Sequence, residues 1–264
     1  MTHLHRWMLA AGSALALLAA ACQTVPLTGR QQIILISPGE ELSLGAAAYK
    51  KTLTSAKLSQ DQAATDMVRR VGQRIAAAAN RPDYQWEFNL VEDKTPNAFC
   101  LPGGKVVVYT GILPFTKDET GLAVVVGHEV AHALARHGAE RMSTGLLTEV
   151  AGKTAGIVFG GGNPQAEKQV EQAFGIGAGV GVLLPFSRHQ ESEADEIGLF
   201  LMAKAGYDPR QSIEFWKRME QAKDGKPPEF LSTHPSDETR IKRIEGWMPE
   251  ALKMYEAQQG SNGK

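Results

Sequence analysis

Two histidines stand four residues apart in the segment His128-Glu129-Val130-Ala131-His132. On a helix, residues i and i+4 lie one above the other about 5–6 Å apart, so both imidazoles can reach one metal ion at roughly 2.0–2.1 Å. Glu129 then lies beside the metal, where its carboxylate can take the proton of the attacking water. This spacing therefore predicts a hydrolytic zinc site. The alternative is a pair of core histidines that are satisfied by hydrogen bonds.

A helix must hold this motif, and the sequence predicts one over residues 116–142. Thr116 and Glu119 fit a capping box at its start. The positions that follow form an apolar face with helical spacing. This face comprises Leu122, Val125, Val126, Val130, Ala133 and Leu134. We therefore expect the two histidines and the glutamate between them to lie within one continuous helix.

A third metal ligand can be sought by spacing. A metzincin would have Gly at position 135 and His at 138, whereas this chain has Ala135 and Gly138, which excludes that class. A second predicted helix begins at Ser187 and carries Glu191 and Asp195 on one face. Glu191 can complete a His-His-Glu site, and Asp195 can hydrogen-bond the far nitrogen of a ligand histidine. The alternative is a solvated acidic helix start that complements the helix dipole.

These motifs resemble those of the gluzincin peptidases that include HtpX and the CAAX prenyl endopeptidases. The soluble lipoprotein branch of that family is the nearest match, and the resemblance spans nearly all of the mature chain. It rests on His128-Glu129-x-x-His132, Ser187-Arg188-x-x-Glu191-x-Glu193-Ala194-Asp195, Pro26-Leu27-Thr28-Gly29-Arg30, Asn97-Ala98-Phe99 with Leu101-Pro102-Gly103-Gly104, and Ser232-Thr233-His234-Pro235-Ser236. The resemblance implies that His128, His132 and Glu191 bind one Zn²⁺ per chain. It also implies that Glu129 is the catalytic base.

The same resemblance implies an α+β fold, a mainly helical zincin-type metalloprotease domain with a small β-sheet or hairpin beside the motif helix. The sequence agrees, because apolar residues alternate over 86–90 as in a strand with one buried face. Residues 97–101 and 105–110 flank a Pro102-Gly103-Gly104 turn. In gluzincins an edge strand here binds the substrate backbone by β-addition. The alternative is a core hairpin that only supports the motif helix.

Two further residues are candidates near the metal. The resemblance favours His234 as an additional zinc ligand or an oxyanion stabiliser over a histidine that caps a loop. Arg240 can orient the site through a salt bridge or serve the oxyanion itself, and a purely structural role stays open. His137 and Arg141, just beyond the motif, are interpreted as residues that support the ligands or pack against them.

The N-terminus predicts a lipoprotein signal peptide over residues 1–21. Basic residues precede the apolar run Trp7–Ala21, which is too short to span a bilayer comfortably. Cys22 follows Ala19-Ala20-Ala21, which resembles a lipobox, although Ala19 stands where Leu is usual and simple secretion is the alternative. A lipid on Cys22 would tether the protein without spanning the membrane. Gln23, rather than Asp, follows the cysteine. By resemblance to Gram-negative lipoproteins, this predicts a location at the outer membrane, with the protein facing the periplasm.

Composition predicts one compact globular domain. The chain has 264 residues, 43% hydrophobic, and a net charge of −1. No basic patch is present in the sequence, which argues against a nucleic-acid partner.

The predicted divisions are a linker over 22–36, the catalytic domain over 37–248 and a C-terminal tail over 249–264. The end of that tail from Gly260 is expected to be disordered. Within the domain, helices are expected over 38–53 and 59–79, and the glycine-rich insertion 143–185 is expected to form a mobile lid. Cys100 is expected to be a small buried hydrophobe without a disulfide.

The expected activity is zinc-dependent endopeptidase cleavage of extended or misfolded envelope proteins, with unfolded or misassembled proteins as the partners. The rival hypothesis is a lipoprotein chaperone or assembly factor that binds unfolded outer-membrane proteins and keeps zinc mainly for structure. A structural zinc site usually has four protein ligands, whereas the motifs supply three and leave one position open. That count favours catalysis.

Overall fold

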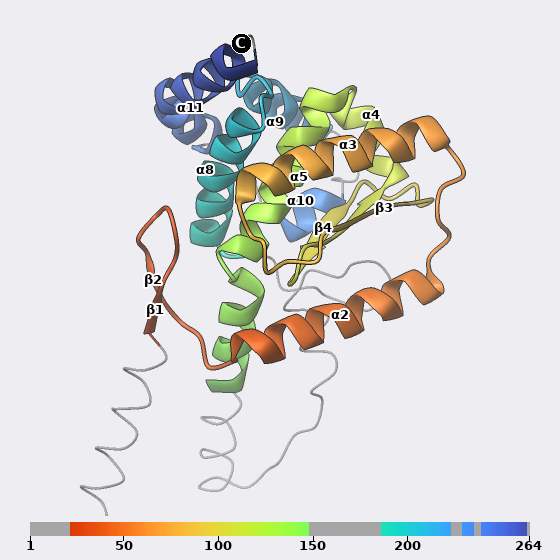
Figure 1. Cartoon of the computed structure of the whole chain (residues 1–264), viewed down its shortest axis with the longest axis vertical. Coiled ribbons are helices and arrows are strands. Elements are labelled where there is room, and N and C mark those ends of the chain that lie inside the picture. Colours follow the sequence, from red (N-terminus) through yellow and green to blue (C-terminus); the bar gives the residue numbers. More distant parts are fainter. Residues whose placement is uncertain (1–21, 148–185, 223–228, 235–238, 263–264) are drawn as a thin grey trace, which may run out of the picture.

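The computed structural model describes residues 22–147, 186–222, 229–234 and 239–262. The predicted signal peptide and residues 148–185 of the predicted lid lie outside them. Most of the described chain is helical and surrounds a small three-stranded sheet (Figure 1). The α+β fold class is therefore confirmed. Within the described residues, no helix combines the length and the apolar character needed to cross a bilayer.

The N-terminal segment is folded, so the expectation of a linker over 22–36 is wrong. Strands β1 (Cys22–Thr24) and β2 (Gln31–Ile33) pair antiparallel, with Cys22 opposite Ile33. The polar composition that indicated a linker hides apolar side chains that are buried one at a time. These are Val25, Ile34 and Ile36. The side-chain amide of Gln32 donates to the Ala135 carbonyl at 2.9 Å, which fixes the hairpin to the rest of the domain.

Two long helices follow. Helix α2 (Pro38–Ser55) begins where predicted, because the Ser37 hydroxyl accepts from the Glu40 amide and Pro38 occupies the first turn. Helix α3 (Gln62–Ala79) is capped by the Asp61 carboxylate, two residues after the predicted start at residue 59. It ends at Asn80, which adopts the left-handed conformation common at helix ends.

The sheet consists of β3 (Glu87–Val91), β4 (Ala98–Leu101) and β5 (Lys105–Tyr109), in the order β3-β5-β4. The predicted hairpin is confirmed, since β4 and β5 pair antiparallel around a turn in which Gly103 and Gly104 have φ values of 85° and 80°. Strand β3 pairs in parallel with β5. Strand β4 therefore forms one edge of the sheet.

The motif helix is shorter than predicted. Residues Thr110–Ile112 (η1) form a 3-10 turn, and Thr116 ends the short helix α4 (Leu113–Thr116). Helix α5 (Glu119–Leu134) begins after Asp118, whose carboxylate accepts from the Gly121 amide at 2.8 Å. The predicted capping residue Thr116 is therefore wrong, because its hydroxyl bonds to the Leu113 carbonyl instead.

A break also divides the predicted helix at its other end. Arg136 has a φ of 59°, after which residues 137–147 are helical again. The Arg136 guanidinium donates to Glu41 at 2.6 Å and to the Ile36 carbonyl at 3.2 Å. These contacts with the N-terminal segment stabilise a backbone conformation that a continuous helix does not contain.

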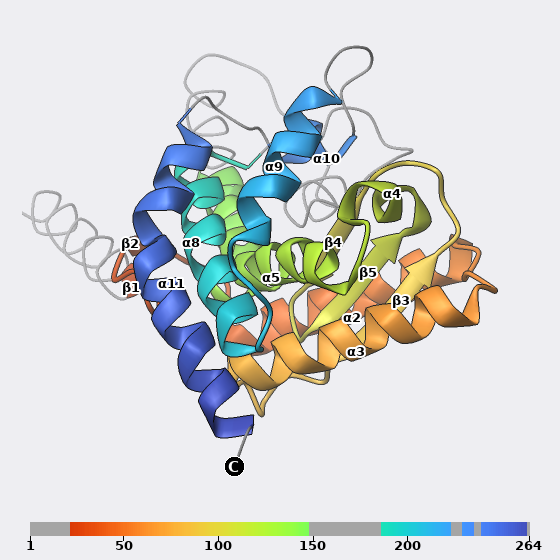
Figure 2. The ribbon, with the colours of Figure 1, turned by 90° about the horizontal axis from the view of Figure 1, so that it is seen from above.

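Helix α8 (Arg188–Lys204) starts with a capping box between Ser187 and Gln190, and α9 (Gln211–Gln221), α10 (Glu229–Thr233) and α11 (Arg240–Asn262) follow. Of these remaining helices, α8 and α9 pack on α5, and α11 packs on α8 and α9. Helix α5 contacts α3, α8, α9 and β4, which places it at the centre of the domain (Figure 2). A C-terminal tail from residue 249 was predicted, but α11 continues through Pro249 to Asn262 and buries Ala251. The predicted boundary at 248 therefore falls inside a packed helix. Residues 260–262, which were expected to be disordered, are helical.

Candidate metal centre

Four buried side chains offer metal-binding atoms to one point. His128 and His132 come from α5, Glu191 from the first turn of α8, and His234 from the residue after α10. One ligand atom of each lies within 4.8 Å of those of the others. Nε2 of His128 is 3.1 Å from Nε2 of His132 and 3.2 Å from Nδ1 of His234. The sequence-predicted ligands therefore lie together.

The charges in this cluster suit a cation. Burial alone would raise the pKa of Glu191, but the adjacent His234 and His128 hold it well below its ordinary value. Burial keeps the pKa of His132 well below its ordinary value, so that imidazole is neutral. Burial also opposes the charge of His128, yet Glu191 and Asp195 raise its pKa to about 9. Three imidazoles and one carboxylate at this spacing fit zinc, which displaces protons from its ligands as it binds.

A close crossing of two helices brings the two motifs together. A Cβ atom at Gly198 would lie 2.9 Å from the backbone nitrogen of His128, and one at Gly127 would lie 2.9 Å from the Gly198 carbonyl oxygen. Both distances are too short for a side chain. The paired glycines therefore let the α8 backbone approach α5 closely enough for Glu191 to reach the histidines.

Asp195 and Arg240 support the side of the cluster around His128. Oδ1 of Asp195 lies 3.1 Å from Nδ1 of His128 and accepts from the Arg240 guanidinium at 2.7 Å. Arg240 also donates to Glu191 at 3.3 Å, and its guanidinium carbon lies 3.2 Å from the centre of the Trp216 ring. The hydrogen bond expected of Asp195 and the salt bridge that is one alternative for Arg240 are therefore present, and the orienting roles stay predictions.

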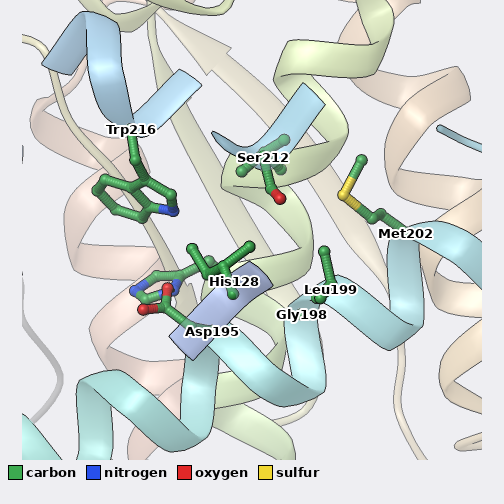
Figure 3. A pocket seen from close by; sticks show the side chains of 9 residues that line it. His128, Asp195, Gly198, Leu199, Met202, Ser212 and Trp216 are labelled. Atoms are coloured by element: carbon green, nitrogen blue, oxygen red, sulfur yellow. The ribbon is translucent and has the colours of Figure 1, made fainter. Parts of the chain in front are cut away.

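Figure 3 shows the Asp195 carboxylate against the His128 ring, with Trp216 nearby. A small cavity of about 10 Å³ lies here, lined also by Ser212 and Met202. The Trp216 and His128 rings meet edge to face, with their centres 5.7 Å apart. The His128 imidazole is thus held both by packing against Trp216 and by the Asp195 carboxylate.

A different set of residues supports His132. Its Nδ1 lies 2.8 Å from Nδ1 of His137, whose Nε2 lies 2.9 Å from Oε2 of Glu193. Burial alone would raise the pKa of Glu193, but hydrogen bonds from His137, Thr28 and Arg30 lower it to about 2. The sequence left open whether His137 supports a metal ligand or only packs against it. It assigned no role to Glu193, Thr28 or Arg30, because no spacing rule joins residues so far apart in the chain.

Glu129 lies beside the cluster, as the motif predicts. Its Oε1 is 3.5 Å from Nε2 of His234 and makes no hydrogen bond within the described part of the chain. Burial raises the pKa of this carboxyl, although His234 and His128 oppose the shift. A buried carboxyl whose pKa is raised towards neutrality is suited to accept a proton and return it.

Cys100 is buried in the main hydrophobic core, and burial raises the pKa of its thiol. This matches its interpretation as a small hydrophobe. Cys22, in contrast, is exposed. Arg141 lies over the Phe186 ring with its guanidinium carbon 4.3 Å from the ring centre, a packing contact next to His132.

The helical domain and its buried cluster of three histidines and Glu191, with Glu129 beside it, have the architecture of a zinc metallopeptidase, and comparison with known proteins identifies the chain as a metalloendopeptidase. Residues 62–248 match peptidase family M48. The chain belongs to peptidase family M48, which confirms the broad relationship to HtpX-like enzymes that the motifs indicate.

Three relatives show the extent of the similarity. Mitochondrial metalloendopeptidase OMA1 of Schizosaccharomyces pombe is 40% identical over 233 residues, which cover 86% of this chain and 66% of that protein. The Saccharomyces cerevisiae protein of the same name is 33% identical, with coverage of 88% and 70%. The Escherichia coli (strain K12) beta-barrel assembly-enhancing protease is 30% identical, with coverage of 84% and 47%. The chain thus spans between 47% and 70% of the length of these relatives.

Proposed function

We propose that this chain is a zinc endopeptidase of the cell envelope that cuts extended segments of misfolded or misassembled proteins. The observation that carries the proposed chemistry is the buried Glu129 carboxylate, whose Oε1 makes no hydrogen bond within the described residues, beside the four side chains that could bind a metal. The envelope location is supported by the exposed Cys22 after the predicted signal peptide and by the name of the Escherichia coli relative. In this proposal a lipid on Cys22 holds the domain at the outer membrane, facing the periplasm.

The residues divide the chemistry among them. Zinc held by His128, His132 and Glu191 would polarise the scissile carbonyl and acidify the attacking water. Glu129 accepts the proton of that water and returns it to the leaving amine. Asp195 keeps the ring of His128 in the orientation and tautomer that bind a metal.

The edge strand β4 offers a place for the substrate backbone. It pairs with β5 on one side and packs on α5, which carries the histidines. Nδ2 of Asn97, just before β4, is buried without a hydrogen-bond partner in the described residues. A peptide added along this edge would satisfy unpaired backbone groups and meet that amide. We therefore favour β-addition over a purely supporting hairpin.

His234 changes the argument from ligand number. The cluster contains four side chains that could bind a metal, one more than the three that the sequence motifs supply, so the open position becomes part of our proposal. The Phe230 amide donates to the Pro96 carbonyl at 2.9 Å, which places α10 at the start of the proposed substrate edge. In our proposal His234 and α10 withdraw together to admit a substrate, and the arrangement described here is latent.

The same closed cluster is the observation that favours the rival function, a chaperone or assembly factor with structural zinc. Changing Glu129 to Gln separates the two. We expect casein cleavage to fall about 10²–10⁴-fold while the zinc content stays unchanged, because only the proton acceptor is lost. Glu119→Gln, at the partly exposed first residue of the same helix, is the matched control and should cleave normally. Cleavage that survives Glu129→Gln would refute the assigned base. Wild-type protein that suppresses aggregation without any cleavage would favour the chaperone.

The membrane tether has its own test. Cys22→Ser should abolish labelling with a radioactive fatty acid and move the protein from the membrane fraction to the soluble periplasmic fraction. Cys100→Ser, at the buried cysteine, should change neither result. Membrane retention of Cys22→Ser would overturn the proposed tether and leave the peptidase assignment intact.

A further inference from the structure

Behind His132 lies a second imidazole, His137, that takes no part in the proposed hydrolysis. Nδ1 of His137 is 2.8 Å from Nδ1 of His132, and its side chain is completely buried. Nε2 of His132 faces the opposite way, 3.1 Å from Nε2 of His128. His132 therefore turns one ring nitrogen to the metal cluster and the other to His137.

Metal binding fixes the direction of these hydrogen bonds. When Nε2 of His132 binds a metal, that nitrogen carries no proton, so Nδ1 holds the proton and donates it. His137 then accepts through Nδ1 and carries its own proton on Nε2. That proton points to Oε2 of Glu193 at 2.9 Å. One consistent direction of donation thus leads from the ligand to a carboxylate.

The N-terminal hairpin holds this carboxylate from the other side. Nε of Arg30 donates to Oε2 of Glu193 at 2.7 Å, and the Thr28 hydroxyl hydrogen-bonds to Oε1. Arg30 is itself fixed by Glu140, to which its two terminal nitrogens donate at 2.7 and 2.9 Å. Both oxygens of Glu193 are therefore oriented by residues that lie more than 160 positions earlier in the chain.

The turn that presents Thr28 and Arg30 has a defined shape. The Val25 amide donates to the Arg30 carbonyl at 2.8 Å, and the Gly29 amide donates to the Val25 carbonyl at 3.0 Å. Gly29 has a φ of 72°, which favours glycine, and Val25 is fully buried. The turn is therefore anchored at its base and holds the two side chains in place.

From these contacts we infer that the hairpin of residues 22–33 is a positioning element of the metal site. Thr28 and Arg30 hold Glu193, Glu193 holds His137, and His137 holds the ring of His132 in its metal-binding orientation. The inference rests on the metallopeptidase site and is independent of where the protein resides in the cell. Arg30, Thr28, Glu193 and His137 are thus positioning residues for a zinc ligand.

Because these residues are buried, the loss of one contact in the series should affect the metal site. Relative exposures are 4% for His132, 0% for His137 and 6% for Glu193, so solvent cannot readily replace a lost partner. Removing a partner of this kind typically weakens metal binding about 10–100-fold. A residue that only stabilised the fold would change the unfolding temperature and leave zinc affinity unaltered.

The test measures zinc affinity by competition with a chelator, together with the visible absorption bands of the cobalt-substituted protein. We expect Arg30→Gln to weaken zinc binding measurably, by less than the roughly 10–100-fold that loss of a partner bonded directly to a ligand costs, and to shift the cobalt bands. Arg30→Lys should recover part of the loss by restoring a donor to Glu193. Arg70→Gln removes an exposed guanidinium that pairs with Glu119 and should leave both readouts unchanged. Thr28→Val gives a milder version of the same effect if Arg30→Gln does not fold.

A double variant shows whether Arg30 acts through His137. His137→Phe keeps an aromatic ring of similar shape and removes the link, so Arg30→Gln should cause no further loss of zinc affinity in that background. Equal losses in both backgrounds would overturn the inference, as would zinc affinity and cobalt bands in Arg30→Gln that match those of Arg70→Gln. Loss of casein cleavage with unchanged zinc affinity would also contradict it, without touching the assignment of Glu129.

Discussion

The two motif histidines of α5, His128 and His132, are supported in different ways. His128 is held directly by a carboxylate, since Oδ1 of Asp195 lies 3.1 Å from its Nδ1. His132 is held indirectly, through His137 and then Glu193. Both supports end on α8, where Glu193 and Asp195 follow Glu191 at alternate positions. One short acidic segment therefore supplies a ligand and the support of both histidines.

The difference shows which parts of a metal site depend on the global fold. Asp195 lies one helical turn from Glu191, so the same helix places both whenever α8 packs on α5. The support of His132 requires the break at Arg136 and an N-terminal hairpin that reaches Glu193 across 163 positions. We expect the direct support to be robust and the indirect support to be sensitive to changes far from the metal.

The largest effect is expected from the direct support. Asp195→Ala removes the partner of both His128 and Arg240 and leaves the buried guanidinium without that carboxylate. We expect a loss of about 3–5 kcal/mol in unfolding free energy, with zinc binding weakened about 10–100-fold. Denaturant unfolding and chelator competition measure the two quantities. Asp195→Asn keeps an acceptor and should lose much less; equal losses would mean that the hydrogen bond to His128 contributes little.

An intermediate effect is expected where the two supports share a helix crossing. Gly198→Ala puts a methyl group 2.9 Å from the His128 backbone nitrogen, which should cost about 1–3 kcal/mol of unfolding free energy as α8 moves away. Gly246→Ala, on α11 with no atom within 4 Å of the added carbon, is the control and should stabilise the helix by up to about 1 kcal/mol. If the Gly198 variant proves as stable as the Gly246 variant, the close crossing is not required.

The smallest effect concerns the hairpin that supports His132. Burial alone would raise the pKa of Glu140, but Arg30 and Gln190 lower it below its ordinary value. A depressed folded-state pKa gives stability that is present above the ordinary value of 4.5 and is lost as the pH falls below it. The Glu140→Gln variant should therefore lose less unfolding free energy than the wild type as the pH falls from about 6 to about 3. An unchanged pH profile would remove Glu140 from the account of the hairpin.

Helical spacing was sufficient to predict the metal-binding residues within each helix, whereas the family resemblance was needed to join the two helices and to add His234. The pair His128 and His132, the position of Glu129, and the pairing of Glu191 with Asp195 all follow from the helical period. The hairpin around Gly103 was predictable for a similar local reason, since its turn requires residues that tolerate positive φ. Local geometry was sufficient wherever both partners lie on one element.

The errors arose where tertiary contacts decide between local alternatives. Thr116 was the predicted cap of the motif helix, and the packed chain shows that Asp118 caps it instead. Residues 22–36 have the polar composition of a linker, yet Val25 and two isoleucines each bury in the domain. Pro249 favours a helix end, but burial of Ala251 accompanies the continuation of α11. His234, in contrast, was a candidate through the family resemblance alone, because no spacing from the histidine motif connects it to the cluster.

The most direct test is to measure the zinc content of variants in which one carboxylate of α8 at a time is changed. It tests the assignment of Glu191 as a zinc ligand. The account predicts one zinc per chain in the wild type, loss of that zinc in Glu191→Gln, weaker but measurable binding in Glu193→Gln, and wild-type binding in Glu196→Gln on the same helix. Full zinc occupancy and unchanged affinity in Glu191→Gln would contradict the assignment of this residue as the ligand that completes the site of His128 and His132.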